Sequence, residues 1–195
     1  MSPGVSPPPP DQVRIGVIGP GRLGQSLVRA LVAADLHVIG LAGRASESAP
    51  AEPPGRQPGQ VSEQVRLVAA SLGVPALLSH QVRELSDLVF LTVPDAGISA
   101  VVSELAGRAP TRDPRRWQAV VHCSGAVDLS GFAPLVARGW LAGSWHPLQA
   151  VPSPDSELRA GITWAITSDD AGLVTLLGGL SRALHGIPRV LPEDA

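Results

Sequence analysis

Three short polar clusters follow the most apolar, strand-like segments of this 195-residue chain. They are Pro94-Asp95, His122-Cys123-Ser124 and Trp145-His146-Pro147. An unperturbed imidazole has a pKa of about 6.5, so two histidines in such places can serve as acid and base near neutral pH. We take His146 as the candidate proton donor and Ser124 as the group that positions a substrate.

Each of these side chains also has a purely structural interpretation. His146 fits a catalytic role and a hydrogen-bonded core role equally well, whereas a structural role is favoured for His122, which lies within a strand end. Cys123 is the only cysteine, and a small buried thiol is a more common role for it than a nucleophile. Asp95 can simply cap the helix that follows it. The His and Cys spacing predicts no metal site.

A glycine pattern lies near the start of the chain, in the stretch VRIGVIGPGRLG. Gly19, Gly21 and Gly24 have the G-x-G-x-x-G spacing, between an expected strand at 13–18 and a helix expected from about residue 22. In that context the first glycine makes a tight turn and the second lets the backbone approach a pyrophosphate. The third lets the helix pack on the strand. The less favoured alternative is a tight turn that binds no ligand.

The residues at the end of the second expected strand indicate which dinucleotide binds. About 20 residues after such a glycine motif, proteins that bind NAD, FAD or S-adenosylmethionine place an acidic residue on the ribose hydroxyls. Here Arg44 and Ser46 stand in that region, and the guanidinium of an arginine suits a 2′-phosphate. We therefore predict NADP(H), bound by the glycine loop with Arg22 and Leu23 and by Arg44 and Ser46. The alternative for Arg44 is a solvated loop charge.

The elements that must position these residues alternate along the chain. Apolar segments predict strands at 13–18, 36–44, 87–95, 117–125, 140–149, 162–167 and 188–191. Helical segments between them predict an α/β fold with a doubly wound, mostly parallel sheet. The carboxyl ends of parallel strands share one edge, so the polar clusters are expected to converge there.

Changes in composition divide the chain into three parts. The proline-rich residues 1–12 are expected to form a disordered or extended tail outside the fold. Residues 13–151 are expected to form the dinucleotide-binding domain. Residues 152–195 are expected to add a linker and a β-α-β extension of the sheet. The final LPEDA has the composition of a helix start, so we expect a helical region to follow it.

The composition excludes several classes of function. The net charge of −2 and the pI of about 6.2 provide no positive field for nucleic acid. Apolar runs are interrupted well before the ~20 residues of a membrane span, and we expect a cytoplasmic protein. The basic residues are all arginine, and the chain has no Lys, Tyr or Asn. A Tyr/Lys proton-transfer pair and a Schiff-base lysine are therefore excluded.

Four segments together carry a resemblance to a known family. IGVIGPGRLG, DLVFLTVPD, HCSGA and GSWHPLQ, in this order and spacing, resemble largely uncharacterised bacterial Rossmann-like oxidoreductases. These are distant relatives of pyrroline-5-carboxylate reductase and of the β-hydroxyacid and 6-phosphogluconate dehydrogenases. The resemblance covers residues 13–195. It implies that Val93 and Pro94 close the fourth strand against the nicotinamide half of the cofactor, and that Ser124 and Gly125 lie beside the nicotinamide ribose or the substrate.

The resemblance also implies parts that this sequence lacks. Family members carry a helical domain after the NADP-binding domain, and the β-hydroxyacid dehydrogenases use a lysine that this chain does not have. A homodimer, if one forms, is expected mainly through that helical region. The expected function is NADP(H)-dependent hydride transfer to or from a small carbonyl or imine, of which a keto acid is one example. The alternative is a noncatalytic NADP-binding module for redox sensing or assembly.

Overall fold

The computed structural model describes residues 6–43, 60–107 and 116–192. Within them, eight strands form one sheet: β1 (Ile15–Ile18), β2 (Val38–Ala42), β3 (Ala76–Leu77), β4 (Leu88–Leu91), β5 (Ala119–His122), β6 (Leu141–Pro147), β7 (Thr163–Thr167) and β8 (Ile187–Val190). The helices are α1 (Arg22–Ala33), α2 (Glu63–Ser71), α3 (Ser79–Leu85), α4 (Asp95–Gly107), α5 (Ala133–Val136) and α6 (Ala171–Ala183), with a 3₁₀ turn, η1 (Ser130–Phe132).

The sheet has the order β3-β2-β1-β4-β5-β6-β7-β8. Neighbouring strands are parallel except β6 and β7, which are antiparallel. The expected α/β fold with a doubly wound, mostly parallel sheet is therefore confirmed. The single antiparallel pair follows from the connection at 148–162, which contains no helix to carry the chain back to the other end of the sheet.

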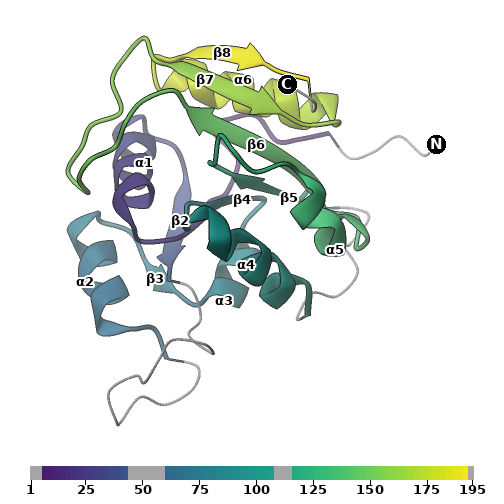
Figure 1. Ribbon diagram of the computed structural model, residues 1–195. Helices are drawn as coiled ribbons and strands as arrows, with labels where there is room; N and C mark the ends of the chain where they lie inside the picture. Colours follow the sequence, from purple (N-terminus) through teal and green to yellow (C-terminus); the bar gives the residue numbers. More distant parts are fainter. Residues whose placement is uncertain (1–5, 44–59, 108–115, 193–195) are drawn as a thin grey trace.

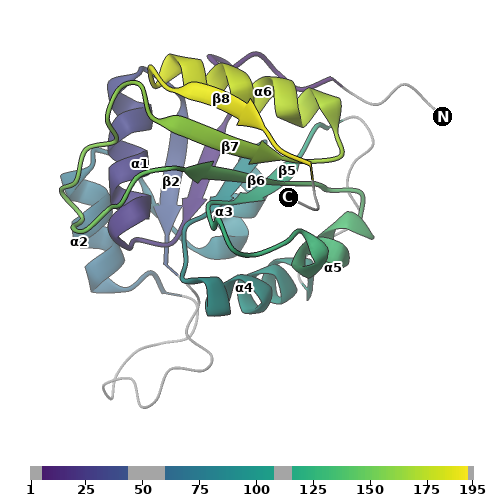
Figure 2. The same ribbon diagram turned by 45° about the horizontal axis from the view of Figure 1, so that its top comes forward.

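Helices cover both faces of the sheet (Figures 1 and 2). One apolar core lies between the sheet and helices α1, α2 and α6, and the other lies between the sheet and helices α3, α4 and α5. In the first core, Trp145 of β6 stacks on Phe90 and Trp164 with ring centroids 5.0 and 3.9 Å apart. Because side chains alternate along a strand, burying Trp145 there puts Ser144 and His146 on the opposite face.

Strand register brings the candidate site residues to one edge of the sheet. Ile18 pairs with Leu91, Leu91 with His122, and His122 with Ser144, so these residues form one row across β1, β4, β5 and β6. The residues that directly follow this row therefore emerge from the same edge. At about 4.8 Å per strand, the row spans roughly 14 Å from β1 to β6.

Two prolines of the N-terminal segment contact helix α6. A Cβ added to Gly172 would lie 3.0 Å from Pro7 Cδ, and one added to Gly179 would lie 2.8 Å from Pro10 Cγ. The two glycines are seven residues apart and so share one face of the helix. The expectation that residues 1–12 stay outside the fold is therefore corrected for Pro7 and Pro10, because these glycines leave room for the rings.

One face of the β7–β8 ribbon carries exposed apolar side chains. Helix α6 packs on the other face, where Trp164 is fully buried. Opposite it, Ile187 is 47% exposed, and Leu191, just after β8, is 41% exposed. Among the helices that the structure describes, none is long and apolar enough to cross a membrane.

Candidate functional site

Two glycines of the loop between β1 and α1 are required by packing inside the protein. Gly19 has a φ of +124°, and a Cβ there would lie 2.6 Å from the carbonyl carbon of Thr92. A Cβ on Gly24 would overlap the carbonyl oxygen of Gly19. The Thr92 hydroxyl donates a hydrogen bond to that same oxygen at 2.8 Å. Both glycines are thus explained by the strand-to-helix turn alone, and Thr92 supports that turn.

Gly21 differs, because nothing in the described chain requires a glycine there. Its φ of −75° is open to any residue, and the nearest atom to an added Cβ is the Thr92 carbonyl oxygen at 4.0 Å. Gly21 is also the N-cap of α1, where no side chain caps the helix. The first amides of a helix have no partner within it, so they are left available to an anion.

The two residues after Gly21 have different surroundings. The Arg22 side chain is exposed and donates a hydrogen bond to the carbonyl oxygen of Pro152 at 3.3 Å. Two turns further on, Arg29 donates to the carbonyl oxygen of Pro154 at 3.1 Å. The loop at 148–162 therefore lies along α1, as Figure 2 shows. Leu23 is partly buried against the core on this side of the sheet.

Of the remaining predicted cofactor residues, one pair follows β4 and the other pair lies outside the described residues. Val93 and Pro94 follow β4, and the preceding Thr92 amide donates to Ile18 of β1 at 2.9 Å, so this strand end adjoins the glycine loop. The chain reverses its winding here, with β1 between β2 and β4, and such switch points are where doubly wound sheets bind ligands. Arg44 and Ser46 lie outside the described residues.

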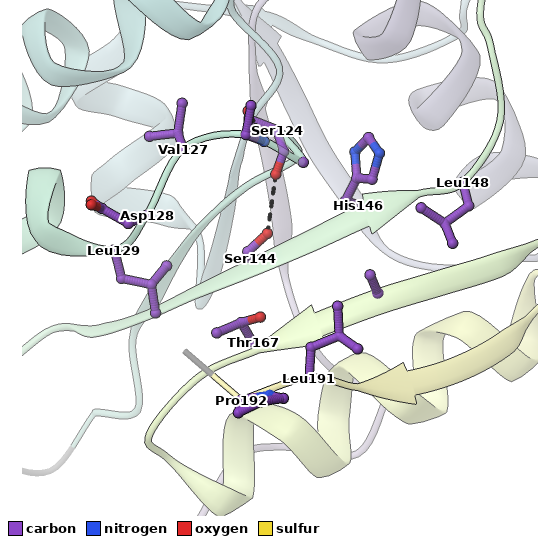
Figure 3. Close-up of a pocket in the computed structure, with 13 residues that line it drawn as sticks. Ser124, Val127, Asp128, Leu129, Ser144, His146, Leu148, Thr167, Leu191 and Pro192 are labelled. Carbon is purple, nitrogen blue, oxygen red and sulfur yellow. Dashed lines mark hydrogen bonds between the residues drawn. The ribbon is translucent and has the colours of Figure 1, made fainter. Parts of the chain in front are cut away.

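Ser124 and His146 are brought together in one pocket of about 240 Å³. Figure 3 shows both side chains at the end of the sheet, with Ser144 and Thr167 below them. The described residues that line it come from the segment after β5, from β6 and the residue that follows it, from β7, and from the segment after β8: Ser124, Gly125, Ala126, Val127, Asp128, Leu129, Ser144, His146, Leu148, Ala165, Thr167, Leu191 and Pro192.

Backbone contacts fix the orientation of the His146 ring. Its Nδ1 lies 2.9 Å from the carbonyl oxygen of Cys123. Because a carbonyl oxygen can only accept, Nδ1 carries a proton and Nε2 is left for other partners. An added Cβ at Gly125 would lie 2.7 Å from Nε2, so only glycine allows this close approach. The ring is thus positioned without any side-chain partner.

Ser124 and Ser144 are joined across neighbouring strands. The Ser144 hydroxyl donates to the Ser124 carbonyl oxygen at 3.3 Å, and the Ser124 hydroxyl accepts from the Ala126 amide at 3.1 Å. Ser144 and Thr167 were not among the site residues predicted from the sequence. Ser144 could have been found from the alternation that places it on the same face as His146. Thr167 could not, because it reaches the pocket only through the antiparallel pairing of β7 with β6.

His122 and Cys123 do not line the pocket. The His122 ring is fully buried, stacks on Phe132 with centroids 5.5 Å apart, and has no hydrogen-bond partner on either nitrogen. Burial lowers the pKa of His122, and the nearby backbone of Asp128 and carboxylate of Asp95 offset only part of this effect. Burial raises the pKa of the Cys123 thiol to about 12. Neither side chain is placed to react with a ligand in this pocket.

Comparison with known protein families supports a Rossmann-like fold. Residues 5–147 match the Rossmann-like domain family. This range holds the strands from β1 to β6, the glycine loop, Ser124 and His146. The chain belongs to this Rossmann-like family. No curated protein matches it in sequence.

Solved structures share the Rossmann-like fold at low sequence identity. Prephenate dehydrogenase from A. aeolicus, solved with hydroxyphenyl propionate and NAD+, is 14% identical with a TM-score of 0.67; the match covers 94% of this chain and 61% of that one. An imine reductase variant from Myxococcus stipitatus with NAD+ is 15% identical, with a TM-score of 0.65 and coverage of 94% and 56%.

A reductive aminase from Aspergillus terreus, solved with NADPH and ethyl-5-oxohexanoate, is 14% identical, with a TM-score of 0.63 and coverage of 94% and 56%. The chain thus spans 56 to 61% of the length of these three proteins. At these identities the likeness is one of fold.

Proposed function

We propose that this Rossmann-like chain is an NADP(H)-dependent oxidoreductase that transfers hydride to or from a small carbonyl or imine substrate. The observation that carries the proposal is Gly21, a glycine that the protein's own packing does not require, at the uncapped N-terminus of α1. A dinucleotide pyrophosphate on these amides explains it. The imine reductase and reductive aminase that share the fold were solved with NAD+ and NADPH, which supports the proposal.

The sheet edge supplies a suitable place for each half of the dinucleotide. The pyrophosphate would lie at Gly21, where Arg22 can turn from the Pro152 carbonyl toward it. The nicotinamide half would extend past Val93 and Pro94 toward Ser124, because these residues follow β4 and β5 at the same edge. The polar pocket would then adjoin the nicotinamide end.

The preference for NADP(H) over NAD(H) rests on Arg44 and Ser46, which follow β2 in the sequence. A charge-assisted hydrogen bond from the guanidinium to the 2′-phosphate is worth about 1.5–3 kcal/mol, or roughly ten- to a hundredfold in affinity. Arg44→Ala is therefore expected to weaken NADPH binding by this factor and to leave NADH binding unchanged. Calorimetric titration of both nucleotides measures this. Equal loss for NADPH and NADH would contradict the assignment.

A bound nicotinamide supplies or accepts the hydride in such a reaction. Reduction of the carbonyl or imine then needs one proton on the developing oxygen or nitrogen, and oxidation needs it removed. His146 Nε2 is placed to give or take that proton, since Nδ1 keeps its own proton on the Cys123 carbonyl oxygen. The neutral ring takes a proton at Nε2, and the doubly protonated ring gives one. The Ser124 hydroxyl can hold the reacting atom in place while the proton moves.

Replacement of His146 tests this assignment. His146→Ala is expected to lower kcat by about 10²–10⁴ and to leave NADPH affinity nearly unchanged, because the ring moves a proton and does not touch the glycine loop. His37→Ala, at an exposed histidine, is the matched control. Steady-state kinetics and calorimetry measure both effects. Loss of folded protein with full turnover per folded molecule would instead make His146 a core residue.

The noncatalytic alternative predicts a different pattern. A redox-sensing or assembly module would show a higher melting temperature with NADPH and would oxidise none of it. A panel of ketones, keto acids and imines separates the two functions. Turnover with any member supports the enzyme, and binding without turnover across the panel overturns it.

A further inference from the structure

Apolar side chains form about half of the lining of the Ser124–His146 pocket. In Figure 3, Leu148 lies to the right, Val127 and Leu129 lie to the left, and Leu191 lies below. Ala165 of β7 also lines the pocket. The pocket volume of about 240 Å³ is below the roughly 300–1,000 Å³ of drug-sized sites, so it suits a small molecule with an alkyl group.

The charges around the pocket are unfavourable to an anion. Among the described residues that line it, none is lysine or arginine, and Asp128 is the one acidic side chain. Its carboxylate points away from Ser124 and His146 and accepts hydrogen bonds from the Ser130 amide and hydroxyl at 3.0 and 2.5 Å. A substrate carboxylate placed here would lose hydration, which is costly, and its one possible cationic partner among the described lining residues would be the doubly protonated ring of His146.

The polar groups of the pocket are few. Ser144 already donates its proton to the Ser124 carbonyl oxygen. The Ser124 hydroxyl and the His146 Nε2 remain to hold and protonate the reacting oxygen or nitrogen, and the Thr167 hydroxyl adds one neutral polar group to the lining. His146 cannot transfer its proton and also neutralise a carboxylate, because both tasks need the same N–H.

We propose that this pocket selects an uncharged carbonyl or imine with a small alkyl substituent and discriminates against a keto acid. The proposal rests on the proposed function, since it takes Ser124 and His146 as the groups at the reacting atom. It narrows the substrate class by one feature, the absence of a carboxylate next to the reacting carbon. The alkyl group would occupy the apolar wall formed by Leu148, Ala165 and Leu191.

A matched pair of probes isolates the carboxylate. Methyl isobutyl ketone and the 2-keto acid with the same isobutyl group differ only in a methyl or carboxylate beside the carbonyl. Saturation-transfer NMR on the full chain with NADPH measures binding of each, and NADPH oxidation measures turnover. We expect the ketone to bind at least tenfold more tightly than the keto acid, and any turnover to follow the same order.

Installing a cation tests the cause of the preference. Leu148 lines the pocket and is 58% exposed, so Leu148→Arg can fold and place a guanidinium at the pocket wall. The variant is expected to raise affinity for the keto acid about tenfold and to reduce affinity for the ketone. Leu148→Gln controls for lost apolar surface, and Val136→Arg, at a 49% exposed site on α5 outside the pocket lining, controls for net charge. Leu191→Arg, at 41% exposure, is a second position if the first variant fails to fold.

Each outcome bears on one of the two proposals. Ketone binding without turnover supports the pocket's selectivity and counts against the proposed oxidoreductase function. Equal or tighter binding of the keto acid by the unaltered chain overturns the selectivity, even if NADPH is oxidised. A keto-acid gain in Val136→Arg equal to that in Leu148→Arg overturns it too, because the effect would then not arise in the pocket.

Discussion

Cys123 stands between two candidate site residues in sequence, yet its side chain belongs to the core. The thiol faces the apolar side of the sheet with Trp145, and the residue is 4% exposed. Its backbone carbonyl, and not its sulfur, contacts His146. A substitution that keeps the backbone therefore leaves the pocket intact.

The reactivity of Cys123 follows from its burial. Because burial raises its pKa to about 12, almost no thiolate forms at neutral pH. Iodoacetamide is expected to label the native protein at least about a hundredfold more slowly than the unfolded protein. Cys123→Ala is expected to keep kcat within about twofold. Rapid native labelling that abolishes turnover would show that the thiol faces the site.

For single residues, the sequence predicted which side chains belong to the candidate sites better than it predicted their contacts. The pairing of Ser124 with His146 in one pocket could be expected, because both follow strands of a parallel sheet. The contacts of the His146 ring with the Cys123 carbonyl oxygen and with Gly125 could not be expected. A backbone partner leaves no signature in residue type. Gly21 could be identified from the motif. Only the surrounding atoms show that it differs from Gly19 and Gly24, which the packing of the turn requires.

Among the elements, β1 and β4 are joined at their start by an ion pair. Arg14, just before β1, donates to both Asp87 carboxylate oxygens at 2.9 and 2.7 Å. Arg116 lies 3.5 Å from the same carboxylate. Burial disfavours the charged carboxylate, but the hydrogen bonds from Arg14 outweigh this and hold the Asp87 pKa below its ordinary value of 3.8.

The lowered pKa of Asp87 makes the fold less stable in acid. A carboxylate with a lowered folded pKa stabilises the fold above the unfolded pKa and loses that effect as pH falls through the folded pKa. Asp87→Asn is therefore expected to lower the free energy of unfolding by about 1–2 kcal/mol at pH 7. This difference should shrink as pH falls below about 4. Urea unfolding at several pH values measures it, and a difference that grows in acid would contradict the account.

The order and type of the elements could largely be predicted, because buried strands and amphipathic helices have distinct apolar periods. The direction of β7 could not be predicted. It depends on the absence of a helix in 148–162 and on the docking of that loop along α1 through Arg22 and Arg29. The contact of Pro7 and Pro10 with α6 was also missed, because proline-rich composition predicts an extended chain without predicting its surface.

Across the whole molecule, the sheet sets the distance between the two candidate sites. The glycine loop follows β1 and the Ser124–His146 pocket follows β5 and β6, at the same edge of one continuous sheet. A dinucleotide lying along that edge would connect them. The proposed function therefore requires that a nucleotide binds at the glycine loop, and the roles proposed for the pocket residues require it too.

The most direct test is calorimetric titration of NADPH into the wild-type chain and Gly21→Ala. A methyl group at Gly21 clashes with nothing in the described protein but would block the approach of a pyrophosphate. Alanine is less favourable than glycine at a helix N-cap, so the melting temperature should fall by no more than about 4 °C. Gly107→Ala, at another glycine with open space around it, is the matched control. We expect Gly21→Ala, and not Gly107→Ala, to weaken NADPH binding at least about tenfold, or ~1.4 kcal/mol. A wild-type chain that does not bind NADPH, or a Gly21→Ala variant that binds it unchanged, would contradict the account.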